Sequence, residues 1–316
     1  MRKALVSAAS KVWLRLDRQP RLVVLTFHRV GDGHPITRDH IRHHLTFLAR
    51  HYEMISPTRL LAGNLPARAA MVTIDDSHRD LYEQIYPEAR SLKVPITICV
   101  PTDYFFRRRW LWFDRLYWML ERTSSGAEAR VNGQVLHAGH APSVAGMKAY
   151  LKRLLPAERE AALDSLAGQL HCTPPPAPAD GYEAVTGDEM REMLASGLTE
   201  ICAHTVSHTI ATVLPEPELR RELAHSKKEL EEFAGREVRS FCYPNGEAGD
   251  FDDRTTRAVK ETGFSMALTS VAGTNPSAGF DPYRILRIHA HRDPSSFEKE
   301  VSGLGDFQRR LAAARH

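Results

Sequence analysis

The stretch Met71–Asp76 (MVTIDD) is the part of the sequence whose residue types most directly suggest chemistry. Its apolar run predicts a buried strand over 71–74, and Asp75 and Asp76 follow where that strand would end. Two adjacent carboxylates at such a place repel each other and are costly to remove from water. They are best tolerated when a cation neutralises one of them or when one holds a proton. A solvated turn or helix cap would explain the same pair, and this stretch alone does not decide.

Two histidines much later in the chain favour the cation. His204 and His208 form an H-x-x-x-H pair in ICAHTVSHTI, directly after a predicted strand. Side chains at this spacing, on a helix or at a strand-to-turn junction, can reach one metal ion. In a chain with 16 His the pair alone is weak evidence. Together with Asp75 and Asp76, it supplies two imidazoles and a carboxylate, the ligand set of a mononuclear catalytic metal site with open positions.

The elements that must position these residues follow an alternating pattern of strands and helices. From Arg21 onward, seven apolar strand-like runs, each reachable by a helical crossover, predict an α/β fold, a barrel of parallel strands. The strands are expected at Arg21–His28, Met71–Asp76, Pro95–Pro101, Thr199–His204, Val238–Tyr243, Phe264–Thr269 and Arg284–Ala290. The helices are expected at about 37–51, 80–92, 187–196, 216–234 and 252–262.

Between about 104 and 186 this rhythm breaks, which predicts an insertion at the barrel rim between the third and fourth strands. Residues 104–120 are dense in aromatics and Arg, residues 146–170 look helical, and 173–180 (TPPPAPAD) is a Pro-rich extended linker. Most of the aromatic stripe is expected to pack a helical subdomain. A rim insertion is also where a lid that selects the substrate would be built.

The two ends of the chain flank the predicted barrel domain of 21–303. Residues 1–20 predict a basic amphipathic helix, and 304–316 form a C-terminal tail. The apolar face of the helix gathers Leu5, Ala8 or Ala9, Val12, Trp13 and Leu16, with Arg2, Lys3, Lys11, Arg15 and Arg18 around it. Residues 2–18 could therefore make peripheral contact with an anionic membrane surface. A helix packed on its own domain, with solvated basic residues, explains the pattern as well.

Composition narrows the partners and the compartment. With 42 Lys+Arg against 39 Asp+Glu, the net charge of +3 is too small to suggest a nucleic-acid partner. No stretch of about 18 or more apolar residues predicts a spanning helix, and the N-terminus lacks the features of a secretory signal. The cysteines have no paired metal-ligand spacing and read as reduced, buried groups. We therefore expect a cytoplasmic protein, located at the inner face of the membrane if the first helix binds there. The oligomeric state is not indicated.

Three motifs resemble a known family. VTIDDS, HTVSH and FCYPNG are similar, in this order, to the motifs of the polysaccharide deacetylases, carbohydrate esterases that share the NodB homology domain. The opening LTFHRV and the ending GTNP…RILRIHAH resemble the Y-P-x-G branch of that family, and the resemblance covers roughly 21–103 and 187–300. It implies a distorted (β/α)7 TIM-like barrel with a helical insertion.

The activity that the resemblance implies is metal-dependent hydrolysis. The enzyme would remove an N-acetyl or other N-acyl group from an amino sugar of a glycan, polysaccharide or glycolipid precursor, and the basic first helix slightly favours a lipid-linked saccharide. Asp76, His204 and His208 would hold a divalent metal and Asp75 would be the general base. Zinc is our first choice, although Co²⁺, Ni²⁺ or Fe²⁺ suits this ligand set about equally.

The resemblance also suggests the remaining site residues. By motif position, the backbone N–H of Asn245 in the turn Tyr243-Pro244-Asn245-Gly246 would stabilise the oxyanion. His289 is the candidate acid that protonates the leaving amine, with His291 as the alternative. The candidate substrate contacts are His28 at the end of the first strand and, in the insertion, Trp112 and Asp114.

Two departures from the family pattern leave an alternative open. Ser77 replaces the glycine after the paired aspartates, so a positive φ there would be strained. Cys242 stands where many relatives have an arginine that tunes the base, unless Arg284 or Arg287 compensates. A catalytically impaired glycan-binding or assembly protein on the same fold is therefore the competing interpretation. A structural zinc site is a third, although such sites are usually closed by four ligands and rich in Cys.

Overall fold

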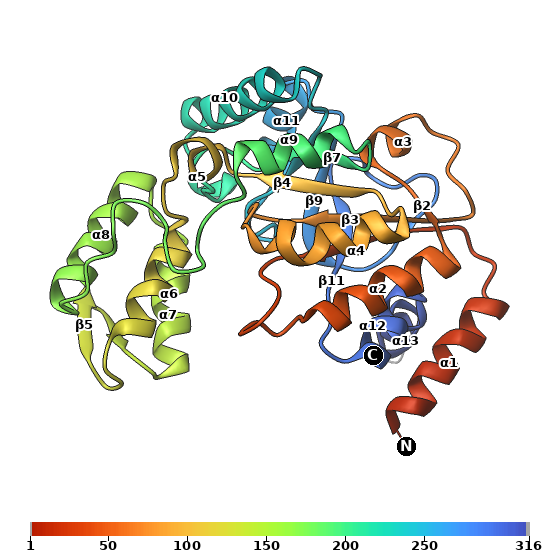
Figure 1. Cartoon of the computed structure of the whole chain (residues 1–316), viewed down its shortest axis with the longest axis horizontal. Helices are drawn as coiled ribbons and strands as arrows, with labels where there is room; N and C mark the ends of the chain where they lie inside the picture. The colour runs from red at the N-terminus through yellow and green to blue at the C-terminus, as the bar shows by residue number, and fades with distance from the viewer. Residues whose placement is uncertain (1, 314–316) are drawn as a thin grey trace.

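The structure, a computed structural model, describes residues 2–313, and its centre is a closed barrel of seven parallel strands (Figure 1). The strands are hydrogen-bonded in the order β1-β11-β9-β8-β7-β4-β3, and β3 pairs again with β1 to close the ring. Their bounds are β1 Arg21–Phe27, β3 Arg68–Ile74, β4 Ile96–Val100, β7 Thr199–Ala203, β8 Ser240–Cys242, β9 Met266–Ala272 and β11 Ile285–His289. The predicted (β/α)7 barrel and all seven predicted strands are confirmed.

The ring of strands is irregular. Strand β8 joins β7 through a single residue pair, Ala203 opposite Phe241, and the register of β11 against β9 shifts between Ile285 and Arg287. Two short strands extend the sheet: β2 (Glu53–Met54) runs parallel to β3, and β10 (Asn275–Pro276) runs antiparallel to β1. The barrel is therefore distorted, as the family resemblance implies.

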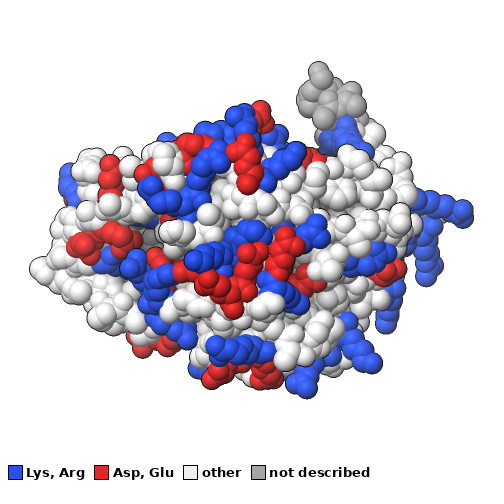
Figure 2. Space-filling model, turned by 90° about the horizontal axis from the view of Figure 1, so that it is seen from above, with Lys and Arg blue, Asp and Glu red and all other residues white. Residues whose placement is uncertain are grey.

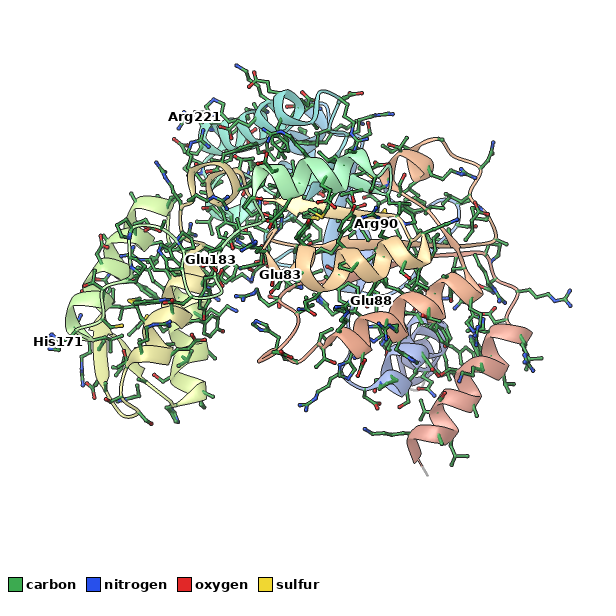
Figure 3. The ribbon with its side chains drawn as sticks, viewed as in Figure 1. Glu83, Glu88, Arg90, His171, Glu183 and Arg221 are labelled. Carbon is green, nitrogen blue, oxygen red and sulfur yellow. The ribbon has the colours of Figure 1, made fainter. Side chains whose placement is uncertain are left out.

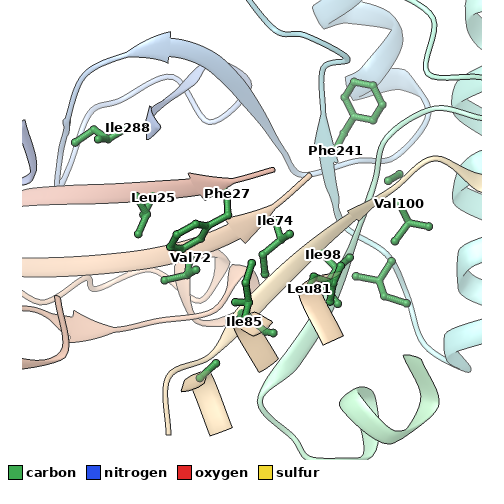
Figure 4. Close-up of a cluster of buried hydrophobic side chains, with 14 of the residues drawn as sticks. Leu25, Phe27, Val72, Ile74, Leu81, Ile85, Ile98, Val100, Phe241 and Ile288 are labelled. Carbon is green, nitrogen blue, oxygen red and sulfur yellow. The ribbon is translucent and has the colours of Figure 1, made fainter. Parts of the chain in front are cut away.

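Helices surround the barrel and cover the outward side chains of its strands. Figure 4 shows the apolar cluster between strands and helices, in which Phe27 and Ile74 meet Leu81 and Ile85. Helices α2 and α4 are also linked by Glu88, which accepts hydrogen bonds from two arginines of α2 (Figure 3). The bounds are α2 Arg38–His51, α3 Pro57–Leu61, η1 Leu81–Ile85, α4 Tyr86–Leu92, α9 Gly187–Ala195, η2 Ala211–Val213, α10 Glu216–Ala234, α11 Asp253–Glu261, α12 Pro294–Val301 and α13 Leu304–Ala313.

The interior of the barrel changes from apolar to polar along the strands. Alternate residues of a strand point inward, and the cluster formed by Leu22, Met71, Cys99 and their neighbours fills the first part of the interior. Further toward the carboxyl ends of the strands, Thr26 and Thr73 lie fully buried beside a charged group described below. The strands therefore end in a buried polar layer, which is where the paired aspartates emerge.

The insertion between β4 and β7 forms a lobe beside the barrel in Figure 1. It contains α5 Thr102–Arg107, α6 Trp112–Arg122, the hairpin β5 Glu128–Val131 and β6 Gln134–His137, α7 Ala141–Leu151 and α8 Pro156–Gln169. Its aromatic residues build a separate core, as expected, in which Trp112 and Trp118 pack with Leu163 and Leu166. The predicted helical stretch 146–170 is wrong in detail. It is divided between α7 and α8, because Pro156 begins a new helix.

Helix α1 (Arg2–Leu16) packs on α12 and α13, but only Trp13 of the predicted apolar face takes part, by stacking on Phe307 of α13. Ser10 and Leu14 are the residues it buries, whereas Leu5, Val12 and Leu16 are 67%, 52% and 74% exposed. The helix thus rests on its own domain and leaves most of the predicted apolar stripe exposed, with Trp13 partly buried. Among residues 2–313, no helix combines the length and the apolar content needed to cross a membrane.

A buried histidine on α2 predicts how stability depends on pH. His44 is fully buried against Phe297 of α12, and burial, with the neighbouring imidazoles, lowers its pKa to about 3. Because this pKa lies below that of the unfolded chain, the unfolded state gains a proton first as pH falls. We expect wild-type protein to lose about 2 kcal/mol more unfolding free energy between pH 7.5 and pH 5 than His44→Phe. Urea unfolding at both pH values measures this, and an equal loss in the two proteins would contradict it.

Candidate metal centre

Asp76, His204 and His208 meet in space, although the loops that carry them follow different strands. The Nε2 atoms of His208 and His204 lie 3.1 Å and 3.6 Å from Asp76 Oδ1. One ligand atom from each of the three residues lies within 4.8 Å of the others, and all three side chains are buried. The carboxyl ends of β3 and β7 thus bring together two imidazoles and a carboxylate, the combination expected from the sequence.

The loops that present these ligands are strained. Asp76 and Ser77 have φ values of 72° and 58°, and Thr205 and His208 have 63° and 53°. Residues with a Cβ avoid this left-handed region at a cost of roughly 1–2 kcal/mol each. The strain anticipated at Ser77 is therefore present. Because both ligand loops contain it, the strain belongs to the geometry of the site and not to one unusual residue.

The site fits a divalent cation. His204 donates its Nδ1 hydrogen to the backbone oxygen of Cys242 at 2.8 Å, which leaves the Nε2 lone pair directed toward Asp76. Asp76 Oδ1 is buried and accepts no conventional hydrogen bond among the described residues. Burial opposes ionisation of Asp76, but the imidazoles of His208 and His204 hold the pKa of this carboxyl well below its usual range. A carboxylate and two imidazole lone pairs that face one another suit a metal ion.

Asp75 has a different partner. Arg287, fully buried inside the barrel, donates from Nη1 to Asp75 Oδ1 at 2.7 Å and from Nη2 to Oδ2 at 2.8 Å. Its Nη1 also donates to the hydroxyls of Thr26 and Thr73, which fixes the guanidinium in place. Although burial opposes ionisation, Arg287 holds the pKa of Asp75 below its usual range. Asp75 is therefore a carboxylate at neutral pH.

The ion pair between Arg287 and Asp75 supplies the cation that is missing at the position of Cys242. Of the two arginines considered as substitutes, Arg284 bonds to Asp253 on the outside of the barrel, and Arg287 bonds to Asp75. Cys242 itself contacts Asp75 Oδ1 only weakly, at 3.8 Å through sulfur. The cation that the motif lacks is thus supplied by another strand.

Two histidines lie at the rim beside Asp75. His28 Nε2 is 3.4 Å from Asp75 Oδ2, and the His28 ring stacks on His289 with centroids 5.5 Å apart. Partial burial, together with His28 and Arg287, lowers the pKa of His289 to about 4. The charged neighbours of His291 are instead Glu300 and Asp293. His289 is therefore the one of the two candidates that shares an environment with Asp75, and its imidazole is neutral near pH 7.

The turn Tyr243-Pro244-Asn245-Gly246 is rigid. Asn245 and Gly246 have φ values of 59° and 66°, and a Cβ at Gly246 would lie 2.8 Å from the backbone nitrogen of Ser270. The Gly246 N–H donates to Pro244 O, and Gly246 O accepts from Ser270 N–H, both at 2.7 Å. Within residues 2–313 the Asn245 N–H has no acceptor. A fixed turn with an unused N–H is the arrangement that an oxyanion donor requires.

The insertion contacts both ligand loops. Asp114 forms a 2.6 Å bond with Nε2 of His78, which follows Ser77, and both side chains are buried. Arg159 of α8 donates to the hydroxyl of Thr209, which follows His208, at 2.8 Å. Asp114 is thus hydrogen-bonded within the protein.

His78 and Arg159 were not predicted from the sequence. The position of His78 beside the acidic pair was an available signal, whereas Arg159 sits in an ordinary charged helix and gave none.

The comparisons with known proteins agree with this geometry. Residues 168–267 match the sequence model of a family described as polysaccharide deacetylase, a segment that includes both histidine ligands but not the aspartate pair. The chain is also 28% identical over 108 residues to the Bacillus subtilis (strain 168) protein YxkH, whose name provisionally assigns it to the polysaccharide deacetylases. That match spans about a third of each protein, 34% of this chain and 36% of YxkH.

Solved structures extend the likeness to the whole fold. The deacetylase PplD of Streptococcus pyogenes superposes with a TM-score of 0.59 at 17% identity, covering 90% of this chain and 99% of PplD. IcaB of Ammonifex degensii gives 0.60 at 18%, covering 90% and 98%. A de-N-acetylase of Aggregatibacter actinomycetemcomitans gives 0.55 at 18%, covering 86% and 96%. At these identities the structures establish a shared fold. Together with the family match, they confirm the resemblance to the polysaccharide deacetylases.

The convergence of ligands predicts a metal-binding phenotype. After incubation with Zn²⁺ and desalting, we expect one ion per wild-type chain by mass spectrometry of the metal. His208→Gln should weaken Zn²⁺ binding at least about 100-fold, because losing a ligand costs more than the ~10–100-fold typical of losing its hydrogen-bond partner. His289→Gln, at the rim but outside the ligand set, is the control and should retain the ion. Equal metal loss in both variants would contradict the assignment.

Proposed function

We propose that this chain is a metal-dependent hydrolase that removes an N-acetyl or other N-acyl group from an amino sugar of a glycan or glycolipid precursor. One observation carries the proposal: Asp76 faces two imidazoles, while the adjacent Asp75 is held apart by Arg287. One carboxylate is thus available to a metal and the other to a proton. The likeness to PplD, which was solved in complex with acetate, and to a de-N-acetylase supports the class of reaction.

Asp76, His204 and His208 would hold the metal, with Zn²⁺ as our first choice and Co²⁺, Ni²⁺ or Fe²⁺ also suited to the donors. When bound, such an ion polarises the acyl carbonyl and lowers the pKa of a coordinated water from ~15.7 to about 7. The Cys242 carbonyl accepts the Nδ1 hydrogen of His204 and so leaves the Nε2 atom of His204 free to bind the ion. His₂Asp sets of this kind leave positions open, which distinguishes them from the closed, Cys-rich structural sites.

Asp75 would take the proton from the attacking water. Arg287 keeps it ionised although it is buried, and the bidentate contact fixes the direction of its free lone pairs. The Asn245 N–H would donate to the developing oxyanion, a contact worth about 3–4 kcal/mol in the transition state. His289 would protonate the leaving amine. Because its imidazole is neutral near pH 7, it must first gain a proton. That proton would be the one that Asp75 takes from the attacking water, passed through His28, which contacts Asp75 and stacks on His289.

The competing class, a glycan-binding or assembly protein without turnover, was suggested by Ser77 and Cys242. Arg287 weakens that argument, because the base has its cation after all. The strain at Ser77 is shared by three other residues of the ligand loops, so it does not mark a damaged site. A binding protein would hold saccharide equally well with and without a chelator and would form no product.

The role of Asp75 can be tested separately from metal binding. Asp75→Asn keeps the size of the side chain and removes its basicity, so release of acetate or formate from N-acylated lipid-linked and free oligosaccharides should fall by about 10²–10⁴-fold. Bound Zn²⁺ should be unchanged, since Asp75 is not a proposed ligand. Mass spectrometry of the saccharides and of the metal measures both. Equal turnover by wild type and Asp75→Asn, or no product from any substrate with Zn²⁺ or Co²⁺, would contradict the proposal.

We also propose that the end of the molecule carrying α1 contacts an anionic membrane surface. Five of the seven large apolar side chains that are exposed among the described residues belong to α1 and α13: Leu5, Val12, Leu16, Phe307 and Leu311. Trp13 stacks on Phe307 and joins the two helices. The basic side chains of Lys3, Lys11 and Arg15 on α1, and of Arg18 just after it, are exposed. On the face seen in Figure 2, Lys and Arg side chains also project from the right-hand edge of the molecule. Apolar side chains surrounded by basic ones suit an anionic bilayer. The cytoplasmic location, at the inner face of the membrane, stays a prediction.

Vesicle binding tests this surface. We expect wild-type protein to sediment with phosphatidylglycerol vesicles and not with phosphatidylcholine vesicles. Val12→Ser combined with Leu16→Ser should weaken binding at least about tenfold, because each large aliphatic side chain contributes about 1.5–3 kcal/mol when buried. Phe106→Ser, which removes an exposed aromatic from the insertion, is the control. Absence of vesicle binding, or self-association through this face in size-exclusion chromatography, would overturn the proposal.

A further inference from the structure

A cavity of about 430 Å³ lies where the insertion meets the loop between His204 and His208. The insertion contributes Trp110, Trp112 and Arg159, and the ligand loop contributes Val206 and Ser207. The volume lies within the ~300–1,000 Å³ range of small-ligand pockets. The metal ligands themselves do not line it, so it is a separate compartment beside the metal centre.

Of the three arginines that line this cavity, two form ion pairs within the described part of the chain and one does not. Arg109 bonds to Asp103 at 3.0 Å, and Arg115 bonds to Glu160 at 2.9 Å. Arg159 is 2% exposed and forms no ion pair within residues 2–313. Its Nη2 donates to Thr209 at 2.8 Å, but its Nε and Nη1 have no partner among the described residues. One buried guanidinium is therefore left with unused donors.

The surroundings of Arg159 compensate its charge only in part, because the nearby carboxylates of Glu160 and Glu222 are hydrogen-bonded to other groups. Burial lowers its pKa only to about 10, so the side chain stays charged at neutral pH. The Trp112 ring lies 5.4 Å from the guanidinium, which is a partial compensation. Arg159 also lies in the first turn of α8, where the helix dipole disfavours a cation. A buried charge is costly unless it is paired and hydrogen-bonded, and the partner that is missing here is an anion.

The walls indicate what kind of molecule brings that anion. The half-buried ring of Trp110 and the prolines of the linker give the cavity flat apolar surfaces, with the nearly buried Trp112 and Tyr104 behind them, and charged side chains form the rest of the wall. Flat apolar walls suit the faces of a sugar ring, and a guanidinium fork suits a carboxylate or phosphate. Ser207 lines the cavity and is hydrogen-bonded to Thr209, so an occupant would lie directly beside the loop that carries His208.

We propose that this cavity binds an oxyanion-bearing sugar ring of the substrate, with Arg159 as its anion partner. The inference rests on the proposed function, because the ring would belong to the saccharide whose acyl group reaches the metal centre. It narrows the substrate class to anionic saccharides that carry a carboxylate or a phosphate. It also gives the insertion a role in substrate selection.

Binding to the full chain of Asp75→Asn, loaded with Zn²⁺, tests the cavity without turnover. The probes for calorimetry are N-acetylglucosamine, N-acetylglucosamine 1-phosphate and a disaccharide of N-acetylglucosamine and glucuronate. We expect at least one anionic probe to bind tenfold or more tighter than the neutral sugar. The two anionic probes distinguish a phosphate from a carboxylate as the partner.

Variants separate anion binding from a merely structural role. Arg159→Met in the same background should abolish the preference for the anionic probe, and Arg159→Lys should retain part of it. Arg115→Met, which removes a paired arginine from the same cavity, should leave the preference intact. Equal affinity for neutral and anionic probes, or a preference that survives Arg159→Met, would overturn the proposal. Weakening of all probes equally by Arg159→Met would instead make Arg159 a brace for Thr209. Failure to detect any deacetylation by wild type would leave these binding ratios measurable, so the two proposals can fail separately.

Discussion

Two neighbouring carboxylates at the end of one buried strand each need a partner that compensates their burial, and the site is arranged around this requirement. Asp75 and Asp76 cannot both be buried and ionised without compensation. The barrel gives Asp75 a guanidinium from β11 and gives Asp76 two imidazoles from the loop after β7. Because the guanidinium occupies Asp75, an ion would be left to Asp76. The different partners of the two adjacent aspartates thus leave Asp76 as the candidate metal ligand and Asp75 as the candidate base.

The rest of the fold holds these charges in place. The threonine hydroxyls of the polar layer orient Arg287, and the Cys242 carbonyl orients His204. The left-handed residues of the two ligand loops carry strain that the surrounding barrel must support. The insertion adds buried polar contacts to both loops through Asp114 and Arg159. The insertion therefore contacts the loops that carry the proposed metal ligands and not only the rim of the barrel.

Much of this arrangement could be predicted from the sequence, for identifiable reasons. Apolar runs of strand length mark the seven strands. The two aspartates follow one of these strands and the two histidines follow another, which places all four residues at the same end of a parallel barrel. Which arginine compensates Asp75 could not be predicted. Arg284 and Arg287 lie close together in sequence, and only the structure shows that β11 begins at Ile285, so that Arg287 lies on the inward face with Ile285 while Arg284 precedes the strand.

Other features depended on packing that no local pattern reports. The periodicity of α1 predicted an apolar stripe, but the helix packs mainly through Ser10 and Leu14 and uses only Trp13 of that stripe. The pairing of His78 with Asp114 and the isolation of Arg159 arise from contacts between segments distant in the chain. Such buried polar groups are decided by what surrounds them in the folded state, which is why they had to be found in the structure.

The most direct test of the account is a crystal structure of the Zn²⁺-loaded protein with anomalous data collected at the zinc edge. We expect one strong peak about 2.0–2.2 Å from a carboxylate oxygen of Asp76 and from the Nε2 atoms of His204 and His208, with Asp75 still paired to Arg287. A second group, formed by Asp75, Cys99 and Cys242, also has ligand atoms close enough to share an ion. A zinc peak there, or one that draws Asp75 away from Arg287, would contradict the division of roles between the two aspartates.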